Sequence, residues 1–138
     1  MRRSLVALAV TTIALPLAAQ DTLSRAERFM RDCDHFGRRD SERLCEVRGV
    51  RMAAGQRVNI DALENGSVRF FGSDRRDVLV RALIQSYGET RAEAEALAKD
   101  VRIQTNGARV YADGPSNRRR QGWHVSYEVW VPHRMDLE

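Results

Sequence analysis

Three polar side chains on one predicted strand are the first candidates for catalysis. His124, Ser126 and Glu128 alternate with apolar residues between Trp123 and Val131, so they share one strand face. Hydrolysis by serine, histidine and an acid needs a converging chain of hydrogen bonds, with the serine at a turn or a helix N-terminus. Residues two apart on a flat strand do not form that chain. We interpret the three side chains as a solvated polar face.

The two cysteines, Cys33 and Cys45, are candidates for a disulfide or for metal binding. An even cysteine count in an exported protein favours a disulfide, which would close a loop of about a dozen residues. Asp32, Asp34 and His35 lie nearby, so a metal site is the sharper alternative. Structural zinc sites show paired short spacings, which are missing here. The sequence therefore predicts a Cys33–Cys45 disulfide, with two free thiols or a metal site as alternatives.

A run of three arginines, Arg118, Arg119 and Arg120, lies in a polar segment between two predicted strands. Arginine pairs with planar anions through two hydrogen bonds, so this run is an anion-binding candidate for phosphate or carboxylate groups of envelope polymers. A solvated loop tip is the alternative. The sequence contains no phosphate-binding loop, dinucleotide fingerprint or zinc-protease motif. We therefore predict a protein that is not an enzyme and needs no cofactor or metal.

Residues 1–20 have the layout of a secretory signal peptide. Arg2 and Arg3 precede an apolar run, and small residues before Gln20 predict cleavage after Ala19 or Gln20. The run is shorter than the roughly 20 residues that span a bilayer, so an uncleaved anchor is the weaker alternative. We expect export to the periplasm, cell envelope or extracellular space, with no transmembrane span after cleavage.

The charge pattern argues against nucleic-acid binding. The chain of 138 residues carries a formal net charge of +4, and acidic residues are interspersed with the arginines. A nucleic-acid interface would show a basic stripe. We expect no nucleic-acid partner.

The rest of the chain reads as a polar N-terminal segment followed by strands and one helix. Residues 21–43 are polar, with apolar spacing that allows a short helix. Thr90-Arg91-Ala92-Glu93 is a capping box that predicts a helix over about residues 91–100. Alternating apolar residues predict strands around residues 45–49, 58–62, 68–70, 77–87, 101–105, 108–112 and 123–131, and Asn106-Gly107 predicts a hairpin turn.

Two Asn-Gly turns lead into short alternating strands at residues 65–69 and 106–110, which hints at stacked repeats. Residues 134–138 look like the start of another strand, so we expect a natural protein that continues beyond Glu138. The predicted fold is mainly β: a stacked or rolled antiparallel sheet leading into a β-solenoid, with the short helix inserted. An open strand edge would allow self-association.

The region 44–138 also resembles the N-terminal part of the bacterial "putative adhesin" domain family of exported, repetitive β-proteins. The resemblance implies a β-solenoid or rolled sheet, an envelope location and no enzymatic activity. It brings no catalytic or binding residues with it. The resembling pieces are Cys45–Arg48, Gly66–Gly72, Asp77–Val80, the helix Thr90–Asp100, Val101–Ala112, Asp113–Pro115 and Val125–Pro132.

These observations favour a non-catalytic envelope protein for adhesion, scaffolding or ligand display. Its expected partner is an envelope polymer or another envelope protein. The alternatives are a periplasmic hydrolase with an unrecognised site, and an envelope-stress sensor or regulatory binding domain. A deep pocket with several shifted titratable groups would favour the hydrolase.

Overall fold

The computed structural model describes residues 17–33, 40–55, 57–63 and 66–137. The predicted signal peptide lies outside them, except for its last four residues, which begin the first helix. The elements are α1 (Leu17–Asp32), β1 (Glu42–Ala53), β2 (Arg57–Asp61), β3 (Val68–Ser73), β4 (Asp77–Gly88), α2 (Arg91–Asp100), β5 (Arg102–Asn106), β6 (Arg109–Asp113), β7 (Gly122–Pro132) and β8 (Asp136–Leu137). The prediction of a mainly β chain with an inserted helix is confirmed.

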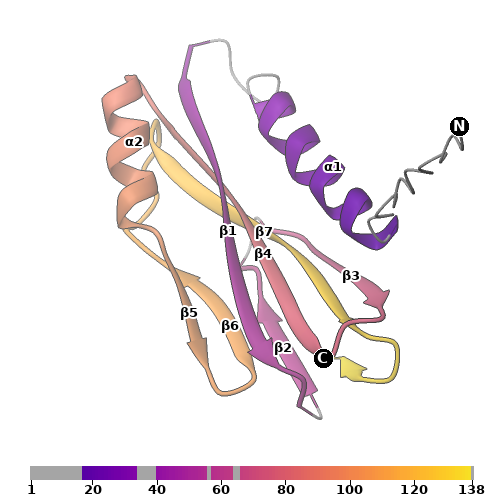
Figure 1. The fold of residues 1–138 in the computed structure, drawn as a ribbon. Helices are drawn as coiled ribbons and strands as arrows, with labels where there is room; N and C mark the ends of the chain where they lie inside the picture. Colours follow the sequence, from indigo (N-terminus) through magenta and orange to yellow (C-terminus); the bar gives the residue numbers. More distant parts are fainter. Residues whose placement is uncertain (1–16, 34–39, 56, 64–65, 138) are drawn as a thin grey trace, which may run out of the picture.

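The long strands form one sheet, here called sheet I, in the order β1-β4-β7-β3. β4 pairs antiparallel with both β1 and β7, whereas β3 pairs parallel with β7. β4 and β7 are therefore the two central strands (Figure 1).

The short strands form sheet II, in the order β5-β6-β2-β8. β5 and β6 make the predicted hairpin, with Gly107 at φ 59° in its turn, but β2 pairs parallel with β6 and with β8. The prediction of antiparallel sheets was therefore wrong in part, because both sheets are mixed. β2 pairs parallel with β6. The strands that follow them in the chain, β3 and β7, also pair parallel with each other.

The core lies against one face of sheet I, here called the inner face. Val78, Val80, Ala82 and Ile84 of β4 are fully buried there. β7 adds the predicted row of buried residues, and sheet II and the end of α2 supply Val58, Val110 and Val101. The packed residues of β7 are Trp123, Val125, Tyr127, Val129 and Val131.

α2 packs on the inner side of sheet I through small residues. Its capping box is present, with Thr90 Oγ accepting from Glu93 N at 3.2 Å and Glu93 Oε2 accepting from Thr90 N at 3.4 Å. Ala94 and Ala98 are buried, and Ser86 Oγ on β4 donates to Ala94 O at 2.7 Å. The small alanine side chains allow the helix to approach the sheet closely.

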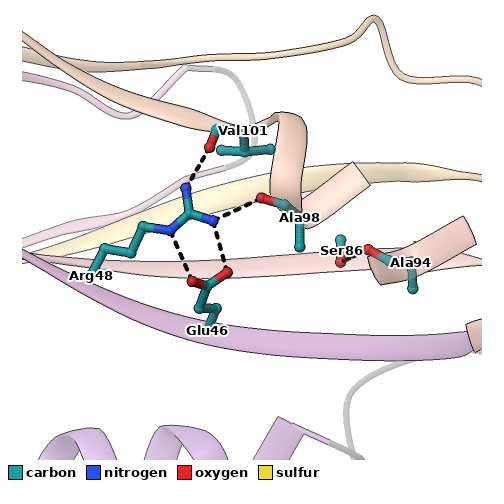
Figure 2. A network of polar contacts seen from close by, with 6 residues as sticks. All are labelled: Glu46, Arg48, Ser86, Ala94, Ala98 and Val101. Atoms are coloured by element: carbon teal, nitrogen blue, oxygen red, sulfur yellow. Dashed lines mark hydrogen bonds and ion pairs between the residues drawn. The ribbon is translucent and has the colours of Figure 1, made fainter. Parts of the chain in front are cut away.

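Arg48 on β1 joins sheet I to the end of α2, as Figure 2 shows. Its guanidinium donates to the carbonyl oxygens of Ala98, at 2.8 Å, and Val101. Glu46 accepts two further bonds, at 3.0 and 2.8 Å, and so orients the guanidinium. These bonds satisfy carbonyl groups that a helix C-terminus leaves without partners.

The described residues form neither a closed barrel nor a solenoid, so the solenoid stays a prediction. The predicted internal repeat is not a structural repeat. Gly66 leads into β3 of sheet I, whereas Asn106-Gly107 forms the hairpin turn into β6 of sheet II. The matching strands are instead the parallel partners, β2 with β6 and β3 with β7.

Candidate functional site

α1 covers part of the other face of sheet I, here called the outer face. A disulfide joins Cys33, just after α1, to Cys45 on β1, with a Cα–Cα distance of 5.9 Å. Cys45 pairs in register with Gln85, which faces away from α2. The predicted disulfide is thus confirmed, and it holds α1 on the side of sheet I opposite α2 (Figure 1).

A cavity of about 660 Å³ lies between α1 and the outer face. Its walls combine charged, polar and apolar side chains, and they come from four parts of the chain. The lining residues are Arg25, Arg28, Phe29, Asp32 and Cys33 at the helix, Ser67 and Arg69 at β3, Leu83 and Gln85 on β4, and Ser126, Tyr127 and Glu128 on β7.

Glu128 is the most unusual side chain of this cavity. It is 6% exposed, and its Oε2 is buried without a hydrogen-bond partner. Its cross-strand neighbours are Arg69 on β3 and Arg81 on β4, but Glu128 makes no ion pair with any described residue. The interpretation of this strand face as solvated was therefore wrong at Glu128, because the sheet and α1 enclose it.

Aromatic and arginine side chains stack beside the cavity. The rings of Phe71 and Trp130 are 5.3 Å apart and nearly parallel. The Arg25 guanidinium lies 4.1 Å from the Phe71 ring centroid, and that of Arg81 lies 5.1 Å from the Trp130 centroid. Trp130 is only 4% exposed, because Phe71 and Arg81 cover its ring.

His124 and Ser126 share the outer face with Glu128 but do not form a catalytic chain with it. Ser126 Oγ accepts a hydrogen bond from Ser67 N at 3.2 Å. Burial, and to a lesser extent the Arg43 guanidinium, lower the pKa of His124. In the part of the chain that the structure describes, no hydrogen bond links the three side chains.

The inner side of β7 holds a second unpartnered polar group. Tyr127 is 1% exposed and its hydroxyl has no hydrogen-bond partner. Burial, together with the nearby charge of Asp61, raises the pKa of Tyr127 to about 12. The phenol therefore stays neutral at physiological pH, which suits a buried core side chain.

The arginine run lies away from this cavity, in the connection between β6 and β7. Arg118 N donates to Gln121 O at 2.8 Å, which fixes a tight turn, and all three arginines are exposed. Arg120 pairs with Glu89 at 2.7 Å, so part of the cluster's charge is already neutralised. Anion binding by Arg118, Arg119 and Arg120 stays a prediction.

Within residues 17–33, 40–55, 57–63 and 66–137, no group of three or more His, Cys, Asp or Glu side chains is arranged to hold a metal ion. Asp34 and His35, from the alternative metal site, lie outside those ranges. Among the same residues, no helix is both long and apolar enough to cross a bilayer.

Comparisons with protein-family models, curated proteins and solved structures found no match to this chain. The adhesin resemblance therefore stays a prediction. Sequence reasoning missed the cavity. The predicted Cys33–Cys45 disulfide indicated that the N-terminal helix is tied to β1, but only the strand register shows that Cys45 and Glu128 share the outer face.

Proposed function

We propose that this protein is a non-catalytic, exported envelope protein that binds a ligand or partner through its β domain. The observation that carries the proposal is the cavity beneath α1, with the unpartnered carboxylate of Glu128 in its wall. A buried charge without a partner is costly to fold, and such groups persist where a ligand uses them. The disulfide that holds α1 over the cavity supports folding in an oxidising compartment.

The geometry favours binding over the hydrolase alternative. Ser126 lies within a flat strand region and accepts a bond from the backbone of Ser67, instead of donating to His124. A serine nucleophile needs a base within hydrogen-bond reach. A sensor or regulatory domain remains compatible with a ligand-binding cavity, and it is the second candidate on that ground.

The adhesin-like solenoid belongs to the same proposal. β2 and β3 lie parallel to β6 and β7, and β8 pairs parallel with β2. Strands that stack in parallel from two sheets are the arrangement from which a solenoid is built. We propose that this parallel stacking belongs to an adhesin-like solenoid.

The expected partner is an envelope polymer or another envelope protein. The exposed Arg118 and Arg119 supply a contact for its phosphate or carboxylate groups, at a site separate from the cavity.

Co-sedimentation of the purified, oxidised protein with isolated cell-envelope material tests this function. We expect a saturable bound fraction that the double variant Arg118→Gln/Arg119→Gln lowers and that Arg76→Gln, an exposed arginine elsewhere, leaves unchanged. His124→Ala should not affect envelope binding, and His124→Ala and Ser126→Ala together test for hydrolysis. A hydrolytic activity that either alanine variant abolishes, or no retention by any envelope fraction, would overturn the proposal.

A further inference from the structure

We infer that the cavity beneath α1 binds a small zwitterion, with an ammonium group placed against Glu128 and a carboxylate group held by Arg28 and Arg69. This inference rests on the proposed binding function and names the chemical class of its ligand. It is carried by the charges of the cavity and by where each charge lies.

The inner charge of the cavity is negative and has no partner. Glu128 is 94% buried, since it is 6% exposed, and it makes no hydrogen bond or ion pair with any described residue. Ser126 lies two residues from it on the same face of β7, and its hydroxyl also lines the cavity. An ammonium group has three donors, which suit the two carboxylate oxygens of Glu128 and the Ser126 hydroxyl.

The rim charges are positive and also lack partners. Arg28 and Arg69 are exposed, line the cavity and form no ion pair or hydrogen bond in the described ranges. A guanidinium binds a carboxylate through two parallel hydrogen bonds. Phe29 and Leu83 give an apolar wall against which the carbon chain between the two ligand charges can pack.

Ligands with a single sign of charge fit less well. A plain amine would satisfy Glu128 but would face Arg25, Arg28 and Arg69. A plain anion would satisfy the arginines but would lie near the buried carboxylate. A divalent metal ion prefers six or more oxygen ligands, and Glu128 and Asp32 are the only carboxylates in the described lining. The volume of about 660 Å³ leaves ample room for an amino acid or a larger residue that carries one.

Calorimetric titration of the full chain, purified with its disulfide intact, tests the inference. The probes are 4-aminobutanoate, butylamine and butanoate, which share a four-carbon chain, and L-alanine, whose two charges lie closer together. We expect one of the two zwitterions to bind roughly tenfold or more tightly than both single-charge probes, because each charged contact contributes on that scale.

Variants assign the two ends of the ligand. Glu128→Gln should weaken binding of the zwitterion by roughly tenfold or more, and Arg28→Gln and Arg69→Gln should each weaken it too. Arg76→Gln, an exposed arginine outside the cavity, is the matched control and should bind as the natural protein does. Because Arg28 and Arg69 are exposed, their variants test the site even if Glu128→Gln alters folding.

Equal binding of butylamine or butanoate, or no binding of either zwitterion, would overturn the inference. Retention on envelope material without zwitterion binding would remove this inference and leave the proposed function standing. Zwitterion binding without envelope retention would overturn the envelope role and leave this inference standing.

Discussion

The buried carboxylate of Glu128 is expected to lower the stability of the fold while it gives the cavity a charged group. Its carboxylate is buried without a partner, so replacing it with the neutral, similarly shaped Gln should raise the free energy of unfolding, by about 1 kcal/mol. Urea denaturation of the oxidised protein measures this. Glu46→Gln is the matched control and should lower stability, because Glu46 orients the Arg48 guanidinium. If Glu128→Gln lowers stability as much as Glu46→Gln does, Glu128 has a structural partner after all.

Asp61 ties β2 to β6 and makes stability depend on pH. Hydrogen bonds from Leu63 N, at 3.0 Å, and from Arg109, at 2.7 Å, lower the pKa of Asp61 below its ordinary value of 3.8. A lowered pKa means that Asp61 stabilises the fold above pH 3.8, and that this contribution is lost as the pH falls through the folded pKa. Asp61→Asn should therefore be less stable than the natural protein at neutral pH.

The stability difference for Asp61→Asn should shrink in acid, as denaturation midpoints measured from neutral pH down to acid would show. Asp113→Asn removes an exposed carboxylate whose one hydrogen bond among the described residues comes from the neighbouring Gly114 N, and it should show little of this trend. A difference that stays constant into acid would contradict the role of the Asp61 charge.

At the scale of elements, local patterns were enough to predict what each segment becomes but not where it packs. The Thr90–Glu93 capping box predicted α2 to the residue, and alternation predicted the buried row of β7. Alternation says which side chains share a face, but it does not say which strands become neighbours. The parallel pairing of β3 with β7 depends on contacts distant in the sequence, so it could not be predicted from local periodicity.

Arg48 fastens α2 to sheet I, so its loss should loosen the whole inner layer. Arg48→Met keeps the apolar stem but removes the bonds to Ala98 O and Val101 O, and it should lower the free energy of unfolding by about 2 kcal/mol. Arg48→Lys keeps the charge near the helix C-terminus but cannot make the two-pronged contact of a guanidinium. Its free energy of unfolding should therefore lie between those of the natural protein and Arg48→Met. Equal stability of Arg48→Met and the natural protein in urea would contradict this role.

The disulfide should hold α1 while contributing little to the core. Replacing Cys33 and Cys45 with Ser removes a cross-link that restricts the unfolded chain. The closed loop is expected to stabilise the fold by about 3 kcal/mol. Amide hydrogen exchange should then rise across the described part of α1, whereas the amides of β4 and β7 stay protected. Binding in the cavity should weaken in parallel, because α1 forms one of its walls. Fast amide exchange throughout β4 in the variant would mean that the stability of the core depends on α1.

At the scale of the molecule, the candidate site exists only because distant segments meet. β7 supplies Glu128, α1 supplies Arg28 and β3 supplies Arg69, and no short motif contains two of the three. The sequence showed Glu128 as one member of a polar strand face. Its burial depends on α1 lying on that face, which the disulfide to Cys45 determines. The site was therefore beyond motif analysis, whereas the disulfide that builds it was not.

The two edges of sheet I differ in a way that predicts how molecules associate. β1 carries five charged residues among its twelve, whereas β3 (VRFFGS) carries one among six. Charged side chains protect an edge strand from pairing with another chain, so β3 is the edge that invites pairing. We expect the average mass from static light scattering to rise with protein concentration. Amide exchange in β3, compared between dilute and concentrated samples, should slow, whereas exchange in β1 should not change. The unpaired backbone groups of β3 are what would drive this association. A protein that stays monomeric at high concentration, or whose amides gain protection in β1 instead, would show that the β3 edge is not the site of association.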